Sequence, residues 1–404
     1  MSLAMSAQVA VLAACAGEAK APAEGETVRD SAGIQIVDNV SPKWTEAERW
    51  SIADTPTVEI GEAEGDTNYQ LFQAFDAVRL DDGRIVVANA GTHQLRFYDR
   101  DGRYLFSSGR KGGGPGEFEN LSFLAKLSGD SLVTHDFNGS RVSIFGPDGK
   151  FVRSFAFKNE GGSSRFSFLI GVLPDRSLLV RADRSSGPGM ALGLHRDTTL
   201  FLVIASDGSV RDTVGSFPGN EFLVLTSTRQ SMSAASRAFG RTTEAAVHAD
   251  RVYIGGGDTY EIGVYTPDGV LKQLIRKRHN NQKVTAEDIE LDAKEWLDAS
   301  PDENRKRATR LVLDKMDYPQ TFPPYSAILM DRLGNLWVRE YRRPTEEQTS
   351  WTVFDSEGRM LGTIAVPKRG DLLEVGADFI LRRWSDDDDI EHIGVFPLVK
   401  PTSR

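Results

Sequence analysis

Short runs of alternating apolar and polar residues recur along the chain, and many are divided by a turn containing Asp-Gly or Glu-Gly. A period of two is typical of a β-strand with one buried face. Asp-Gly favours a tight hairpin because glycine readily adopts a positive φ. Hairpins of this type are predicted at residues 95–109, 142–155, 202–215, 262–275 and 351–364.

A second hairpin pattern precedes each of these segments, and a sixth lies near the C-terminus. These patterns occupy residues 77–88, 124–135, 170–181, 245–256, 327–340 and 372–384. The turn glycines of the first two long hairpins, Gly102 and Gly149, are 47 residues apart. A four-stranded propeller blade spans about 40–50 residues. The pattern therefore predicts an all-β fold, a six-bladed β-propeller of four-stranded blades over residues 45–400.

The last blade is one strand short, because the chain ends soon after the apolar run at residues 390–399. Residues 57–75 repeat the pattern of residues 104–123, which is a strand, a glycine, a polar stretch and then aromatic residues. We therefore expect the N-terminal strand at 57–61 to complete the last blade. Closing the ring in this way removes two exposed sheet edges.

One long segment, residues 284–316, breaks the strand period and predicts two helices between blades four and five. Thr285 with Asp288 forms a weak capping box, and residues 300–303, Ser-Pro-Asp-Glu, are a strong helix start. The basic run at 305–310 has two interpretations. It is either a solvated helix face or part of a lid that meets an acidic ligand at the channel mouth.

The glycine-rich stretch GRKGGGPGEF, residues 109–118, superficially resembles a phosphate-binding loop. A Walker-type loop requires Gly-Lys followed by Ser or Thr at the start of a helix. Here Lys111 is followed by Gly112, and strand residues come next. We interpret the stretch as the crossing between two blades, with Phe118 packed between them.

The amino-acid composition bears on the class of protein and on its partners. The 404-residue chain is 40% hydrophobic and 26% charged, which is typical of a globular protein. Its net charge of −10 argues against a nucleic-acid partner. Cys15 is the only cysteine, so no internal disulfide can form.

Residues 4–16 form a short apolar run that is too short to span a bilayer and contains Leu12-Ala13-Ala14-Cys15. This tetrapeptide resembles the lipobox of bacterial lipoproteins. The resemblance implies a signal peptide at 1–15, a lipid on Cys15, and a flexible tether and N-terminal segment at 16–44. It also implies a membrane-anchored position in the bacterial cell envelope, at the outer membrane or facing the periplasm. The alternative is an unmodified tail that contains a cysteine.

A resemblance to a propeller repeat is also visible. Residues 81–118, DDGRIVVANAGTHQLRFYDRDGRYLFSSGRKGGGPGEF, resemble an NHL-type repeat, the unit of six-bladed β-propellers. Residues 334–344 and 351–367 resemble the final blades of bacterial propeller lipoproteins with no established activity. The resemblance implies the fold but does not single out a function, because propellers include binding proteins, hydrolases and lyases.

In this topology the Asp-Gly turns lie on one rim, and the second-to-third strand connections and blade crossings lie on the other. The second rim has long, irregular segments at residues 135–140, 181–199, 215–244, 255–261, 340–350 and 385–391. Binding residues are commonly found on such loops. We therefore expect a protein or small-molecule ligand at this rim. The candidate ligand-binding residues are Asp76, His135, Asp136, Asn138, Glu244 and Asp258.

Two functional hypotheses remain. Resemblance to lactone-hydrolysing propellers, which hold a divalent metal on Glu, Asn and Asp, implies a metal-assisted hydrolase or lyase. However, the six histidines show no metal-ligand spacing, and Asp386–Asp389 lack the alternating spacing of a calcium loop, so a solvated hairpin tip is favoured there. We therefore favour a surface-anchored binding or scaffolding propeller without a cofactor or metal.

Overall fold

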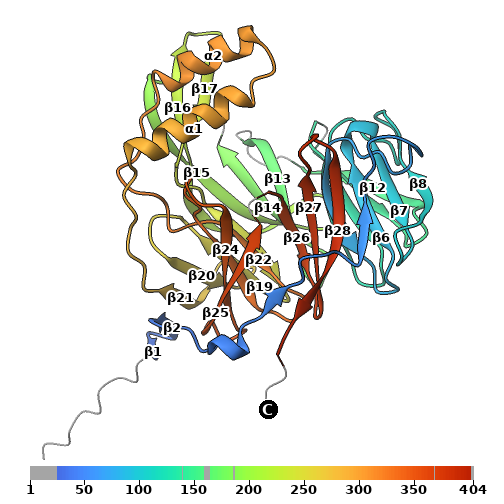
Figure 1. Cartoon of the computed structure of the whole chain (residues 1–404), viewed down its shortest axis with the longest axis horizontal. Coiled ribbons are helices and arrows are strands. Elements are labelled where there is room, and N and C mark those ends of the chain that lie inside the picture. Colours follow the sequence, from blue (N-terminus) through green and yellow to red (C-terminus); the bar gives the residue numbers. More distant parts are fainter. Residues whose placement is uncertain (1–24, 139, 159–163, 185–186, 368, 402–404) are drawn as a thin grey trace, which may run out of the picture.

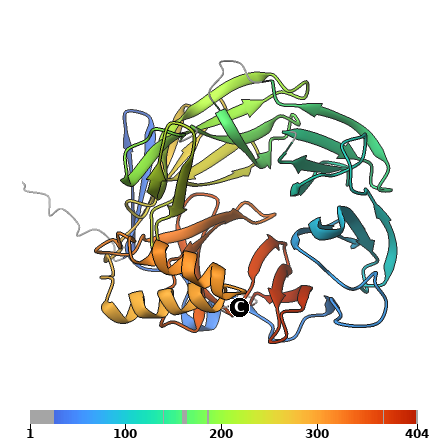
Figure 2. The same cartoon turned by 90° about the horizontal axis from the view of Figure 1, so that it is seen from above.

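The computed structural model describes residues 25–138, 140–158, 164–184, 187–367 and 369–401. Within these residues, six β-sheets are arranged around a central axis (Figure 2). The predicted six-bladed β-propeller is confirmed.

The first three blades follow one another along the chain. Blade one contains β5 (Ala74–Arg79), β6 (Ile85–Asn89), β7 (Gln94–Tyr98) and β8 (Tyr104–Ser108). Blade two contains β9 (Leu121–Lys126), β10 (Leu132–Asp136), β11 (Arg141–Phe145) and β12 (Phe151–Ala156). Blade three contains β13 (Ser164–Val172), β14 (Leu178–Arg184), β15 (Gly193–Ile204), β16 (Val210–Ser227) and β17 (Met232–Ser236).

Blades four and six also include N-terminal strands. Blade four contains β18 (Glu244–His248), β19 (Arg251–Gly255), β20 (Glu261–Tyr265) and β21 (Leu271–Lys277), joined by β1 (Glu26–Ser31) and β2 (Ile34–Asn39). Blade five contains β22 (Tyr325–Met330), β23 (Leu336–Glu340), β24 (Gln348–Phe354) and β25 (Met360–Pro367). Blade six contains β26 (Asp371–Val375), β27 (Phe379–Ser385) and β28 (Glu391–Val399), joined by β3 (Ser51–Ile52) and β4 (Val58–Ile60).

The Asp-Gly turns fold as the sequence predicts. In the hairpin between β7 and β8, the Gly102 N–H donates to the Asp99 carbonyl over 3.0 Å, and Gly102 has a φ of +83°. The Asp99 carboxylate accepts the N–H groups of Asp101 and Arg103. Aspartate thus satisfies the turn backbone, while glycine supplies a conformation that other residues rarely adopt.

The glycine-rich stretch is the crossing from β8 to β9, as predicted. Phe118 is fully buried, and its ring centroid lies 5.7 Å from that of Phe145 in blade two. The same apolar cluster includes Phe97 of blade one, so Phe118 fills the space between the two blades.

The ring closes through the N-terminal segment, which confirms the expected completion of the last blade. Residues Val58–Ile60 pair with β28 in antiparallel fashion, with Ile60 opposite Ile393. Ile60 is fully buried against blades six and one. The two ends of the chain therefore form one sheet.

The hairpin β1–β2 was not predicted by the sequence analysis, which assigned residues 16–44 to a tether and N-terminal segment. β2 pairs in parallel with β21 along Gln35–Asn39. The buried Asn39 side chain donates to the carbonyl of Gly358 and accepts the N–H of Met360, both in blade five. This hairpin thus ties blade four to blade five.

Blade three differs from the expectation of irregular loops at 181–199 and 215–244. β15 and β16 form a long hairpin from these residues and rise above the ring (Figure 1). Pro218 and Gly219 are typical strand breakers, but β16 accommodates them beside a register shift between Arg196 and Thr198 of β15.

The two predicted helices are present between blades four and five. They are α1 (Ala286–Asp298) and α2 (Glu303–Leu313), and Thr285 and Asp302 cap their N-termini. Both helices lie beside the β16–β17 extension on one side of the ring, and they leave its centre uncovered (Figures 1 and 2). The described helices are too short or too polar to cross a membrane.

Candidate functional site

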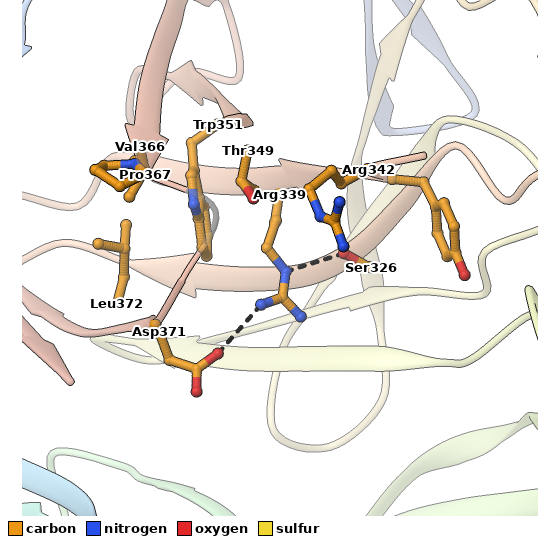
Figure 3. Close-up of a pocket in the computed structure, with 11 residues that line it drawn as sticks. Ser326, Arg339, Arg342, Thr349, Trp351, Val366, Pro367, Asp371 and Leu372 are labelled. Carbon is orange, nitrogen blue, oxygen red and sulfur yellow. Dashed lines mark hydrogen bonds and ion pairs between the residues drawn. The ribbon is translucent and has the colours of Figure 1, made fainter. Parts of the chain in front are cut away.

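The rim that carries the second-to-third strand connections and the blade crossings is called the loop-rich rim below. A pocket of about 330 Å³ opens on this rim between blades five and six (Figure 3). This volume lies at the lower end of the range for small-molecule sites. The pocket is lined by Ser326, Arg339, Tyr341, Arg342, Thr349, Trp351, Val366, Pro367, Gly370, Asp371 and Leu372.

Strand geometry directs these side chains toward one space. Thr349 and Trp351 alternate along β24, so both face the pocket while Ser350 between them is exposed. Ser326 lies in a register shift of β22, where Tyr325 pairs with Glu340 and Ala327 with Arg339. A bulge of this kind redirects the side chain of its extra residue. The Ser326 hydroxyl accepts a hydrogen bond from Arg339 Nε over 2.9 Å.

The polar wall of the pocket contains two arginines and one carboxylate. Arg339 Nη1 donates to Asp371 over 3.4 Å, whereas Arg383 Nη2 donates to the other Asp371 oxygen over 2.6 Å. Arg342 Nη1 donates to the carbonyls of Arg343 and Glu346, and no ion pair of Arg342 occurs within the described residues. The pocket wall is therefore positively charged overall.

The floor of the pocket is apolar. Trp351, Val366 and Leu372 are almost completely buried and form the floor. The Arg339 guanidinium carbon lies 5.9 Å from the centre of the Trp351 ring. Figure 3 shows Arg339 between the side chains of this floor and Arg342. The pocket thus combines an aromatic surface with hydrogen-bond donors.

A second pocket of about 500 Å³ adjoins the first and shares Gly370 and Asp371 with it. Its wall includes Asp386, Asp387 and Asp389 from the tip of the β27–β28 hairpin, where the sequence predicts a solvated hairpin tip. Asp386 accepts the N–H groups of Asp388 and Ile390, and Glu391 accepts those of Gln73 and Ala74. Several of these carboxylates thus hold the backbone of the rim, and they make this second pocket acidic.

The candidate residues from the sequence lie on three blades. Asp76 is on β5, where its carboxylate accepts the N–H of Leu124 in blade two over 3.3 Å. Burial raises the pKa of Asp76 to about 7, and the nearby charge of Glu374 adds to this shift. The backbone N–H groups of Leu124 and Ala77 act in the opposite direction. Asp76 is thus partly protonated at neutral pH.

His135 and Asp136 end β10. His135 is buried and stacks on Phe157, and its Nδ1 lies 3.1 Å from the Ser122 hydroxyl. Burial lowers the pKa of His135 to about 4, so its ring is neutral at pH 7. The buried Asp136 carboxylate accepts the N–H groups of Glu119 and Asn120, over 2.6 and 2.9 Å, and so holds the blade crossing.

The other three candidates have different surroundings. Asn138 is exposed in a turn after β10. Glu244 accepts a hydrogen bond from Thr242, and burial raises its pKa. Both Asp258 carboxylate oxygens accept from Arg196 Nη1, over 2.7 and 2.8 Å, and Asp258 also lies near Arg241. Within the described residues, no three His, Cys, Asp or Glu side chains are grouped so as to hold a metal ion.

The sequence pattern pointed to carboxylates that could bind a metal and did not indicate the residues of this pocket. A signal was present in the sequence, because Arg339 directly precedes the expected loop at 340–350, Arg342 lies within it, and Arg383 lies near the end of the predicted hairpin at 372–384. Their convergence with Trp351 could not be inferred without the packing of blade five against blade six.

The fold and this rim define the class of protein, a six-bladed β-propeller. Residues 67–159 match the DUF5128 family model, which is described as a 6-bladed beta-propeller. A search of curated proteins finds no match.

The chain is also similar to several solved structures. A member of the DUF4221 family from Bacteroides vulgatus is 11% identical, with a TM-score of 0.51, and the similarity covers 88% of this chain and 100% of the other. A Bacteroides fragilis protein described as exported has 13% identity, coverage of 90% and 100%, and a TM-score of 0.49. A virginiamycin B lyase from Staphylococcus aureus has 10% identity, coverage of 87% and 100%, and a TM-score of 0.43. The similarity to the DUF4221 protein, at 11% identity and a TM-score above 0.5, indicates the fold alone.

Proposed function

We propose that this protein is a binding propeller whose ligand site is the pocket between blades five and six. The observation that carries the proposal is the convergence of side chains from β22, β23, β24, β25 and β26 on one pocket of about 330 Å³. A rigid ring fixes these strands, so the site is preorganised and loses little conformational freedom when a ligand binds.

The geometry gives less support to a metal-assisted hydrolase or lyase. Such a mechanism needs a preorganised cluster that holds the ion and positions water. In the described part of the chain, Asp76 and Asp136 accept backbone N–H groups, Asp258 pairs with arginines, and Glu244 accepts the Thr242 hydroxyl. A binding function requires only the pocket and its polar groups.

Filling the pocket tests the proposal. Ser326→Tyr places a ring in the pocket, whereas Ser350→Tyr adds the same ring to the exposed face of β24. A library of small molecules would be screened against the wild-type protein by thermal shift, and hits would be measured by calorimetry. We expect Ser326→Tyr to abolish binding of a hit and Ser350→Tyr to retain it. Equal binding by both variants would show that the ligand site lies elsewhere.

We further propose that the propeller is anchored in the bacterial envelope through Cys15, which lies outside the described residues. The support is the lipobox-like Leu12-Ala13-Ala14-Cys15 after a short apolar run. The precursor expressed in bacteria should incorporate labelled palmitate, and Cys15→Ala should not. Equal labelling of the two proteins, or recovery of the precursor in the cytoplasm, would refute the anchor.

A further inference from the structure

We propose that the pocket between blades five and six selects a small organic monoanion, a carboxylate attached to a planar apolar group. This inference rests on the proposed binding function and adds the chemical class of the ligand. Three features of the pocket support it: an incompletely neutralised pair of arginines, an aromatic floor, and an acidic neighbouring pocket.

The first arginine, Arg339, is oriented but weakly paired. Ser326 fixes its Nε at 2.9 Å, which holds the guanidinium in one orientation. Its carboxylate partner, Asp371, is 3.4 Å away and forms a much shorter bond with Arg383. The Arg339 side chain is also 32% exposed to solvent. A ligand carboxylate could therefore reach its remaining N–H groups.

The second arginine, Arg342, is oriented without being neutralised. Its Nη1 donates to two backbone carbonyls, of Arg343 and Glu346, over 3.0 and 2.8 Å. Carbonyl dipoles fix the position of a guanidinium but leave its full charge. Arg342 and Arg339 both line the pocket (Figure 3). Two neighbouring cations repel each other, and a bound anion would offset this repulsion through charge-assisted hydrogen bonds.

The floor determines what the anion is attached to. Trp351, Val366 and Leu372 offer the pocket an apolar surface that an inorganic anion would leave unused. These three side chains expose only 4%, 2% and 8% of their surface, so a planar group packed on Trp351 would gain dispersion contacts with the floor while its carboxylate met the arginines. The small volume, about 330 Å³, also favours a compact ligand.

The neighbouring pocket limits the charge of the ligand. Beyond Gly370 and Asp371, its wall contains Asp386, Asp387, Asp389 and Glu391, against two arginines, Arg369 and Arg383. A second negative charge extending in this direction would be repelled. The two pockets together therefore favour one negative charge over several.

A matched set of probes tests the inference. Phenylacetate, phenylacetamide and 2-phenylethylamine share the aromatic group and differ in charge, while inorganic phosphate and citrate lack the ring. Calorimetry on the folded wild-type protein should show phenylacetate binding at least tenfold tighter than each of the other four probes. Arg339→Gln and Arg342→Gln should each weaken phenylacetate binding about tenfold or more. Arg369→Gln removes the same charge from the neighbouring pocket and should change the affinity by less than threefold.

The outcomes separate this inference from the proposed function. If phenylethylamine or phenylacetamide binds as tightly as phenylacetate, and Ser326→Tyr abolishes that binding, the pocket is a binding site but the anion inference is wrong. If phenylacetate binds and neither arginine variant weakens it, the inference is also wrong. If Ser326→Tyr leaves all binding unchanged, both proposals fail. If thermal melting shows that Arg339→Gln does not fold, the phenylacetate affinity of Arg342→Gln alone decides the outcome.

Discussion

At the scale of single residues, Asp76 shows how packing changes a side chain that the sequence marks only as a carboxylate. Its Oδ2 accepts the N–H of Leu124, which links the inner strands of blades one and two. The pKa of about 7 means that the folded protein holds a proton on Asp76 at pH values where the unfolded chain has lost it. Stability must therefore depend on pH through this residue.

The sign of this dependence follows from linkage. A carboxyl group with a raised folded-state pKa contributes stability that is complete below its unfolded pKa, near 4, and is lost as pH rises through 7. The wild-type protein should lose up to about 1.4 kcal/mol per pH unit in this interval through Asp76. We expect Asp76→Asn, which cannot ionise, to remove this component, as measured by urea unfolding at pH 4.5, 6 and 7.5.

Other groups also titrate between pH 4 and 7, so the test compares the pH dependence of stability in the wild type with that in Asp76→Asn. The lowered pKa of His135 acts in the opposite direction, because it destabilises the fold as pH falls toward 4. Asp101→Asn, in an exposed hairpin turn, is the control and should retain the wild-type slope. An unchanged slope in Asp76→Asn would contradict the assigned protonation.

At the scale of elements, the helical insertion is attached to the ring by a buried ion pair. Asp288 in the first turn of α1 is fully buried and accepts hydrogen bonds from Thr285, its N-cap residue, and from Arg343 of blade five. Burial alone would raise the pKa of Asp288, but these hydrogen bonds hold it below the usual value. One carboxylate thus caps the helix and anchors it to the loop-rich rim.

Substitution of Arg343 tests whether helix α1 depends on this ion pair. Arg343→Ala leaves the Asp288 carboxylate buried without its cationic partner, which costs about 3 kcal/mol. We expect the amides of α1 to exchange with solvent markedly faster, measured by hydrogen exchange with mass spectrometry. Lys294→Ala breaks only the exposed pair with Asp298 on the same helix and should cost less than about 0.5 kcal/mol. Equal exchange in the two variants would mean that another contact anchors the helix.

At the scale of the whole molecule, closure joins residues from the two ends of the chain. β28 near the C-terminus pairs with β4 over Val58–Ile60 and with β3 over Ser51–Ile52. On the rim opposite the loop-rich rim, ion pairs join four blades. Arg332 of blade five pairs with Glu374 of blade six and with Asp81 of blade one. Asp81 also pairs with Lys126 of blade two. Ring stability is therefore distributed over contacts between blades.

Two truncations and one substitution test how much the N-terminal strands contribute to the stability of the closed ring. Removal of residues 1–24 should leave the unfolding free energy unchanged, because the described sheets are retained. Removal of 1–61 should lower it by several kcal/mol, because the edge of β28 becomes exposed. Ile60→Ala in the full chain should cost roughly 3 kcal/mol without a deletion. A melting temperature of the 1–61 truncation equal to that of the 1–24 truncation would contradict closure by β4.

Features that depend on residues close together in the chain could be predicted from the sequence alone. The Asp99–Gly102 turn and the Thr285 cap were predictable because their hydrogen bonds join residues three or four positions apart. The period of two predicted the blades because alternation directly reports which strand face is buried. Even the closing strand at 57–61 was predictable, since a repeat with one missing strand indicates where its partner lies.

Which surfaces of the blades meet depends on the packing of the whole folded chain. The parallel pairing of β2 with β21 and the length of β16 depend on partners far away in the sequence, and no local pattern encodes that choice. The pocket has the same origin, because Ser326, Arg339 and Asp371 come from three strands of two blades. Their proximity is set by the packing of blade five against blade six, which fixes side-chain positions that alternation alone leaves open.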